Sequence, residues 1–264
     1  MTTLAAPTLS DALARTGEVD LRAFHGFGGL HGGLTTALLL RAMRSAAARA
    51  LRPVEVTAHL VRPITESPQL DTAIAHTGRA LTLASAAATS GERPAAHATA
   101  VLAAPLDPRA PGGPAAWAEP RPTDVRPVAN AERFAIPPEL VPIATRFEIR
   151  PATARLPFSA ADAPELCAWI RLTDPVEDPW ERLLVLADAL APSYAAVLAA
   201  PRPVPTVRTS VRFVPEAATT VFDWVLVRAT TTHAGADGWL TETIHVWSPD
   251  GTTLATASQL RLLV

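Results

Sequence analysis

The chain has 264 residues, 48% hydrophobic and 18% charged, enough apolar material for one large domain or two fused small ones. Its formal net charge of −2 gives no concentrated basic face, so neither nucleic acid nor an anionic membrane surface is expected as a partner. Charged residues interrupt every apolar run before the roughly 18 residues that a bilayer span requires, and the N-terminal stretch does not resemble a signal peptide. We therefore expect a cytoplasmic globular protein without a membrane span.

A glycine-rich stretch, FHGFGGLHGG at residues 24–33, precedes the first predicted helix. The run at 34–51 consists mainly of Ala, Leu, Met and Arg, which favour a helix, and Pro53 is expected to end it. This helix is apolar on nearly every face, so other elements must cover it. Alternating patterns and the turn SGER at 90–93 then predict an antiparallel meander of four strands. Their ranges are 54–63, 69–78, 80–90 and 94–103.

A proline-rich segment at 105–145 interrupts the pattern. Proline removes a backbone donor and fixes one backbone angle, so neither a helix nor an internal strand is expected to persist there. We interpret this segment as a linker. Its apolar residues Trp117, Phe134 and Ile136 indicate that it packs along the surface of the protein.

The second half of the chain repeats the order of elements seen in the first half. A helix is predicted at 180–200, and a short strand is predicted before each helix, at 19–27 and at 165–174. Such a duplication predicts two tandem units of one architecture, at 1–104 and 146–264. The four strands predicted after the second helix are 206–215, 221–234, 238–248 and 253–264.

One apolar helix wrapped by a curved antiparallel sheet, present twice in a chain, is the layout of the double hotdog, an α+β fold. The sequence resembles the acyl-CoA thioesterase family of that fold, the thioesterase II type and its relatives. FGGLHGGL, LADALAPS and VWSPDGTTLATASQ carry much of this resemblance, which covers nearly the whole chain apart from the linker. It implies an acyl-CoA substrate, hydrolysis to a free acid and CoA with no metal or other cofactor, and a dimer of double hotdogs.

The resemblance also assigns a role to the glycine-rich entrance. In similar hotdog enzymes an HGG before the central helix polarises the thioester carbonyl, which carries over to His31, Gly32 and Gly33. A helix N-terminus offers unpaired N–H groups and a positive dipole end, and glycine lets a substrate approach the backbone. We expect the Gly33 N–H to be the main donor. The simpler interpretation is a tight strand-to-helix connection in which His31 only caps the helix.

The resemblance further implies an Asp, a Thr or Ser, and a Gln in the second unit that hold and activate the attacking water. Gln259 matches the Gln, and Thr232 matches the hydroxyl residue, with Thr231 as the competing choice. Arg208 occupies the expected Asp position, and an Arg cannot accept a proton at neutral pH. Asp188 is the candidate base in its place, because a carboxylate in an apolar stretch needs a partner or a function.

Asp188 also has a purely structural interpretation, in which a neighbouring hydroxyl or Arg208 pairs with it. An alternative to catalysis is therefore a non-hydrolytic acyl-CoA or acyl-chain binding protein on the same fold. Other chemistries have less support. The sequence contains no GxSxG elbow and no HExxH spacing, and Cys167, the single cysteine, lies in a predicted strand where a small buried hydrophobic residue is expected.

Overall fold

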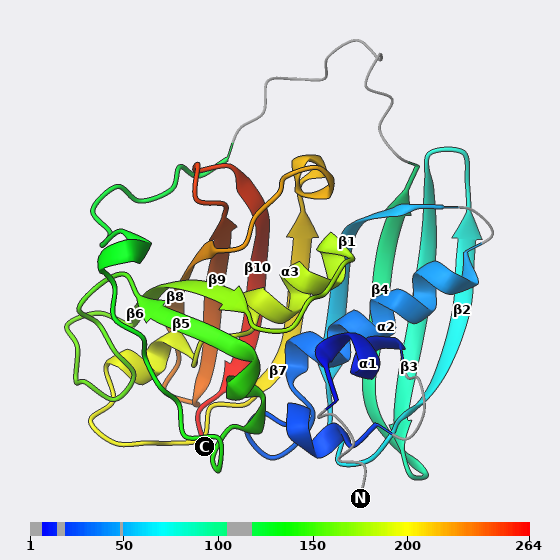
Figure 1. The fold of residues 1–264 in the computed structure, drawn as a ribbon. Coiled ribbons are helices and arrows are strands. Elements are labelled where there is room, and N and C mark those ends of the chain that lie inside the picture. The colour runs from blue at the N-terminus through cyan, green and yellow to red at the C-terminus, as the bar shows by residue number, and fades with distance from the viewer. Residues whose placement is uncertain (1–6, 15–18, 48–49, 105–117) are drawn as a thin grey trace, which may run out of the picture.

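The structure is a computed structural model that describes residues 7–14, 19–47, 50–104 and 118–264. One curved, ten-stranded sheet carries two helices, α2 and α3, on the same face (Figure 1). The strand order is β2-β3-β4-β1-β7-β10-β9-β8-β6-β5, and every neighbouring pair is antiparallel. The helices are α1 (Leu9–Ala14), α2 (Gly32–Ala46) and α3 (Pro179–Ala187). The strands are β1 (Arg52–Leu60), β2 (Gln69–Thr77), β3 (Leu81–Ser90), β4 (Arg93–Ala103), β5 (Phe147–Pro151), β6 (Glu165–Leu172), β7 (Thr206–Phe213), β8 (Val225–Ala234), β9 (Trp239–Trp247) and β10 (Thr253–Leu262).

The predicted repeat is present as a helix followed by four strands in each half, α2 with β1–β4 and α3 with β7–β10. β1 and β7 pair at the centre of the sheet and join the two halves, with Thr57 opposite Ser210. β5 and β6 extend the sheet beyond β8. Most residues of α2 are buried, as expected for a helix that is apolar all round. Within the described part of the chain, no helix is long and apolar enough to cross a membrane.

The first helix ends earlier than predicted. α2 stops at Ala46, and β1 has already begun at Arg52, so Pro53 lies inside a strand and does not terminate the helix. The register of β1 against β4 shifts between Pro53 and Glu55. Such an irregularity lets a strand accommodate a proline, which cannot donate a ladder hydrogen bond.

The second helix is also shorter than the predicted 180–200. α3 ends at Ala187, Asp188 is its C-cap, and a short 3₁₀ helix follows at Ser193–Ala196. Pro192 prevents the helix from continuing to 200, because it has no N–H to donate to the Asp188 carbonyl and its ring would clash with that carbonyl. The Asp188 carbonyl is therefore open to another partner.

The strand predicted at 19–27 does not form. Residues Leu21–Phe24 are a 3₁₀ helix, because the Asp20 side chain accepts a hydrogen bond from the Arg22 N–H at its start. Among the described residues, one isolated bridge forms in this region, between His25 and Leu30. The matching prediction in the second half is confirmed, since residues 165–172 form β6.

The first described part of the proline-rich segment packs on the sheet face opposite to the helices, whereas Phe134 and Ile136 further along pack against the main core. The indole N–H of Trp247 donates to the Glu119 carbonyl at 3.0 Å, and that of Trp169 donates to the Arg126 carbonyl at 2.8 Å. Phe134 forms a bridge with Ile149 further along. Trp117 lies outside the described residues. The segment thus covers a small second apolar cluster on the outer face of the second half, made of Ala131, Ala152, Cys167, Trp169, Leu226 and Trp247.

Candidate active site

The two helices lie antiparallel, so that each end of α2 meets the opposite end of α3. At one end, Arg41 and Arg44 of α2 form ion pairs with Glu181 and Asp178 of α3, each with an N–O distance of 2.6 Å. At the other end, the start of α2 meets Asp188 at the end of α3. The fold therefore brings the glycine-rich entrance of the first half against the candidate carboxylate of the second half.

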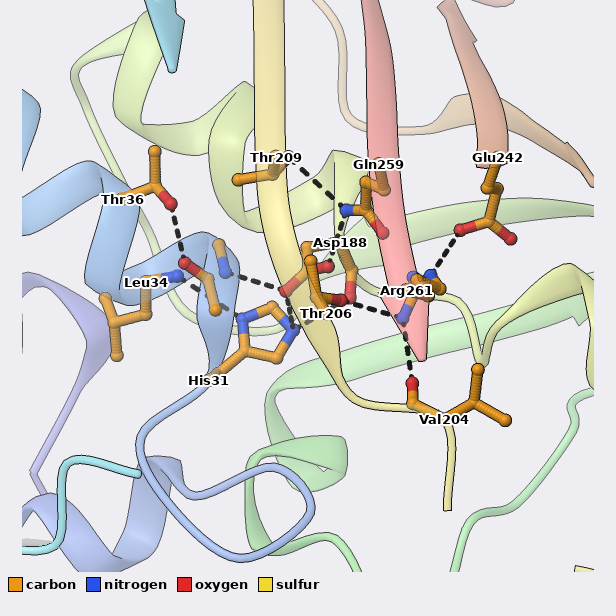
Figure 2. Close-up of polar contacts among 12 residues, drawn as sticks. His31, Leu34, Thr36, Asp188, Val204, Thr206, Thr209, Glu242, Gln259 and Arg261 are labelled. Atoms are coloured by element: carbon orange, nitrogen blue, oxygen red, sulfur yellow. Dashed lines mark hydrogen bonds and ion pairs between the residues drawn. The ribbon is translucent and has the colours of Figure 1, made fainter. Parts of the chain in front are cut away.

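Both carboxylate oxygens of Asp188 accept hydrogen bonds (Figure 2). The Gly33 N–H donates to Oδ2 at 2.7 Å, and the Gln259 side-chain Nε2 donates to Oδ1 at 2.9 Å. The side chain is 14% exposed. Donors on both oxygens suit an ionised carboxylate, and the positive end of the α2 dipole favours that charge. Each oxygen keeps a further lone pair for a water molecule.

His31 caps α2, as the simpler interpretation expected, and also holds Asp188 in place. Its Nδ1 accepts a hydrogen bond from the Leu34 N–H at 3.3 Å, and its Nε2 lies 2.8 Å from the Asp188 carbonyl oxygen. Because a carbonyl can only accept, Nε2 carries the proton and the ring is the neutral tautomer. Both ring nitrogens are therefore occupied. His31 therefore orients the end of α3 at Asp188, and neither of its ring nitrogens is free to accept a further proton.

Gln259 is almost completely buried, with 1% of its surface exposed. Its Nε2 also lies 3.4 Å from the Thr209 hydroxyl, so both amide protons point toward acceptors. The reverse orientation would place the amide oxygen against a carboxylate oxygen, which fixes the orientation of the amide. Its Oε1 is buried and has no hydrogen-bond partner in the described chain. This amide oxygen can therefore accept a hydrogen bond from a water molecule or a ligand group.

The first two residues of α2, Gly32 and Gly33, allow the close contact between the helices. A Cβ atom on Gly33 would lie 2.4 Å from the Leu184 carbonyl oxygen of α3 and 2.9 Å from the Asp188 Cβ. A Cβ on Gly32 would lie 2.8 Å from Asp188 Oδ2. We expected these glycines to admit substrate to the backbone. The structure instead places α3 against Gly33, whose N–H donates to Asp188.

Three of the predicted residues do not reach this cluster. Thr232 falls at an irregularity between β8 and β9, and its exposed hydroxyl donates to the Thr241 carbonyl at 3.3 Å. The Thr231 hydroxyl lies 2.8 Å from that of Ser193, in a neighbouring polar group. Arg208 directly precedes the buried Thr209 on β7 and so points to the opposite face of the sheet. Arg208 therefore does not pair with Asp188.

The sequence reasoning missed three buried polar residues at the site, Thr209, Glu242 and Arg261. Thr209 is the hydroxyl that contacts Gln259, and Glu242 forms a buried ion pair with Arg261, at 2.7 Å between Oε2 and Nε. All three lie on the buried face of their strands, where the other residues are mostly apolar. A polar residue that interrupts the apolar face of an alternating strand was the available signal.

Two other kinds of site were considered among the described residues: a cysteine nucleophile at Cys167 and a cluster of metal ligands. Cys167 is 2% exposed, and burial, with the nearby Glu165 charge, raises the pKa of its thiol to about 12. The reactive thiolate is therefore scarce at neutral pH. In the described ranges, no group of three or more His, Cys, Asp and Glu side chains converges to hold a metal ion.

We expect Cys167 to resist alkylation in the folded protein. At pH 8 the native chain should react with iodoacetamide far more slowly than the same chain in 6 M guanidinium chloride, because both burial and the raised pKa suppress the thiolate. Mass spectrometry of the intact protein measures the labelled fraction. Labelling of the native chain at the denatured rate would show that this thiol is exposed and ionised.

Helices on one face of a curved antiparallel sheet, repeated within one chain, with a carboxylate at the junction of the helices, define a double-hotdog protein. Sequence models of the acyl-CoA thioesterase N-terminal and C-terminal domains match residues 22–103 and 122–263. The chain belongs to the acyl-CoA thioesterase family. This confirms the resemblance inferred from the sequence and the predicted fold.

Solved structures agree with this assignment. A hotdog-fold protein of unknown function from Alicyclobacillus acidocaldarius is 25% identical, with a TM-score of 0.82 over 94% of this chain and 92% of that chain. The TesB protein of Mycobacterium avium subsp. paratuberculosis is 17% identical, with a TM-score of 0.72 over 97% and 100%. The acyl-CoA thioesterase II TesB2 of Mycobacterium marinum is 14% identical, with a TM-score of 0.64 over 90% of each chain. The last two show a shared fold. No curated protein is similar enough to count as a match.

Proposed function

We propose that the protein hydrolyses acyl-CoA thioesters to a free acid and CoA, and that Asp188 and Gln259 activate the attacking water. The observation that supports this most directly is the unpartnered Gln259 Oε1, buried beside a carboxylate. A water molecule at that oxygen would donate one hydrogen to Oε1 and the other to Asp188. Gln259 and the Asp188 carboxylate would then hold the nucleophile and face it toward the substrate.

The proposed reaction follows from these two contacts. Asp188 takes a proton as the water oxygen attacks the thioester carbonyl carbon, which forms a tetrahedral oxyanion. Collapse of this intermediate breaks the carbon–sulfur bond, and the proton on Asp188 passes to the departing CoA thiolate. The products are one carboxylic acid and one thiol, and Asp188 returns to its ionised form. Neutral His31, bonded to the Asp188 carbonyl, keeps the carboxylate in place through the cycle.

The oxyanion requires a donor other than the Gly33 N–H, which already serves Asp188. The Leu34 N–H donates to His31, and the Thr35 N–H donates to the His31 carbonyl. Gly32 is the first residue of α2, so its N–H has no acceptor within the helix and stands at the positive end of the helix dipole. We therefore assign the polarisation of the thioester carbonyl to Gly32, one residue before the position predicted from the sequence.

Replacement of Gln259 tests the proposal. We expect Gln259→Leu to lower kcat for the best of a panel of short, long and aromatic acyl-CoAs by about 10²-fold, because the water loses its acceptor and its orientation. Release of free CoA, followed with a thiol reagent, measures the rate. Leu has similar bulk and leaves no buried Oε1, so the fold should survive.

Ser258→Ala is the matched control, because Ser258 is next to Gln259 on β10 and points to the opposite face of the sheet. Its turnover should equal that of the wild type. If Gln259→Leu retained full kcat while folded, the water would be held elsewhere and the proposed mechanism would be wrong.

A further inference from the structure

Strands β7 to β10 carry a row of polar residues on the sheet face that is covered by the helices. The proposed reaction gives a role to only some of them. Across β7, β10, β9 and β8 the register places Thr209, Gln259, Glu242 and Thr231 opposite one another in turn. Opposite residues on antiparallel strands have Cβ atoms about 4.5–5.5 Å apart. Gln259 therefore stands between two carboxylates, Asp188 on one side and Glu242 on the other.

Glu242 is 1% exposed, and both its oxygens are occupied. Oε1 accepts a hydrogen bond from the Ser193 backbone N–H at 2.5 Å, and Oε2 accepts one from Arg261 Nε at 2.7 Å. Arg261 is itself 6% exposed, and its Nη1 donates to the Thr206 hydroxyl at 2.8 Å. Figure 2 shows Arg261 between Glu242 and the Asp188–Gln259 pair. The ion pair is thus buried, hydrogen-bonded and adjacent to the site.

Without a cation, Glu242 would compete with Asp188 for Gln259. An amide N–H bonds more strongly to a carboxylate than to a neutral acceptor, and a buried carboxylate lacking a partner is costly. The Gln259 side chain could then turn its Nε2 toward Glu242. Such a turn would break its 2.9 Å bond to Asp188 and redirect the Oε1 that is proposed to hold the water.

We propose that Arg261 is a positioning residue, which neutralises Glu242 and so keeps the Gln259 amide on Asp188. Arg261 acts through Gln259 and need not touch the substrate. The inference rests on the proposed function, because it concerns the orientation of the group that holds the attacking water. It also explains why an ion pair, which stabilises a fold little when buried, lies beside a catalytic pair.

The test compares Arg261→Met with the double variant Arg261→Met, Glu242→Gln. Arg261→Met should lower kcat by about 10-fold to 10²-fold with the KM for acyl-CoA changed less than about threefold, since the loss is one of orientation. The double variant should regain most of the wild-type kcat, because the neutral Gln keeps an acceptor for the Ser193 N–H without a charge that attracts Gln259. Circular dichroism melting confirms that each variant is folded at the assay temperature.

Arg150→Met is the control for loss of a partly buried arginine, because Arg150 forms an ion pair with Glu148 on β5, the edge strand of the sheet, and contacts neither Asp188 nor Glu242 in the described structure. It should lose thermal stability and keep its kcat. If Arg261→Met does not fold, kcat is measured for two other variants, the double variant and Glu242→Gln alone. Both lack the charge on Glu242, so their kcat values show whether the site is active without the ion pair. A folded Arg261→Met with full kcat, or a folded double variant as slow as the single one, would overturn the inference. A wild-type chain without turnover would overturn the proposed function and this inference with it.

Discussion

Asp188→Asn should lower thioester turnover by about 10² to 10⁴-fold, the usual contribution of a general base. Asn has nearly the same shape, but it cannot take the proton from water. Asp188 accepts hydrogen bonds from two donors, the Gly33 N–H and Gln259 Nε2. The Asn amide nitrogen is itself a donor and would face one of them, so one hydrogen bond would be lost. The expected cost in the free energy of unfolding is about 1–3 kcal/mol. Free CoA release and urea unfolding measure the two effects separately.

Asp174→Asn provides the comparison for that variant. Asp174 is a largely buried carboxylate that accepts from the Leu9 N–H at 2.9 Å and pairs with Arg146, and in the described structure it contacts neither Asp188 nor Gln259. The loss of Asp174 should weaken the fold by a similar amount and leave kcat unchanged. Equal turnover in Asp188→Asn and the wild type would mean that Asp188 has only the structural role considered from the sequence.

Gly33→Ala should damage both stability and activity. Alanine at a helix position is favoured over glycine by about 1 kcal/mol, but here its Cβ would meet the Leu184 backbone carbonyl at 2.4 Å. A backbone atom cannot move aside as a flexible side chain can, so α3 must shift. Overpacking of this kind costs about 1–3 kcal/mol or more, which exceeds the gain in propensity. A shift of about 1 Å at Asp188 is enough to lower kcat by about 10²-fold.

Gly26→Ala is the matched glycine control. A Cβ at this position meets only His31 atoms, at 3.8 Å, which is an ordinary contact. Its stability should stay within about 0.5 kcal/mol of the wild type, and its kcat should be unchanged. Thermal melting and CoA release on both variants decide the matter. A stable and active Gly33→Ala would show that the close approach of α3 to α2 is not required.

Most of the fold could be predicted from the sequence, because its strands alternate clearly and its order of elements repeats. The errors occur where one residue has an effect beyond local propensity. Pro192 stops the second helix from reaching 200, although the apolar pattern continues. Asp20 caps a 3₁₀ helix where a strand was expected. Pro53 is accommodated inside β1 by a shift of register.

The candidate site could be predicted only in part. His31, Gly33, Asp188 and Gln259, all named from the sequence, form one hydrogen-bonded cluster, and their catalytic roles stay a prediction. The glycine motif did not reveal that the Gly33 N–H donates its hydrogen bond to Asp188. That contact depends on how closely two helices from different halves of the chain approach each other. The hydroxyl residue was sought on β8, whereas the hydroxyl in contact with Gln259 is Thr209 on β7. Strand neighbours that are distant in sequence cannot be read from a local pattern.

The central claim is that this chain turns over acyl-CoA at the Asp188–Gln259 site. The most direct measurement is free CoA release by the purified wild-type chain across short, long and aromatic acyl-CoAs, with equilibrium binding of the same compounds followed in parallel. We predict saturable release that continues over many turnovers for at least one acyl class. Saturable binding without release on any member of the panel would contradict the claim and would mark the protein as an acyl-CoA binding module.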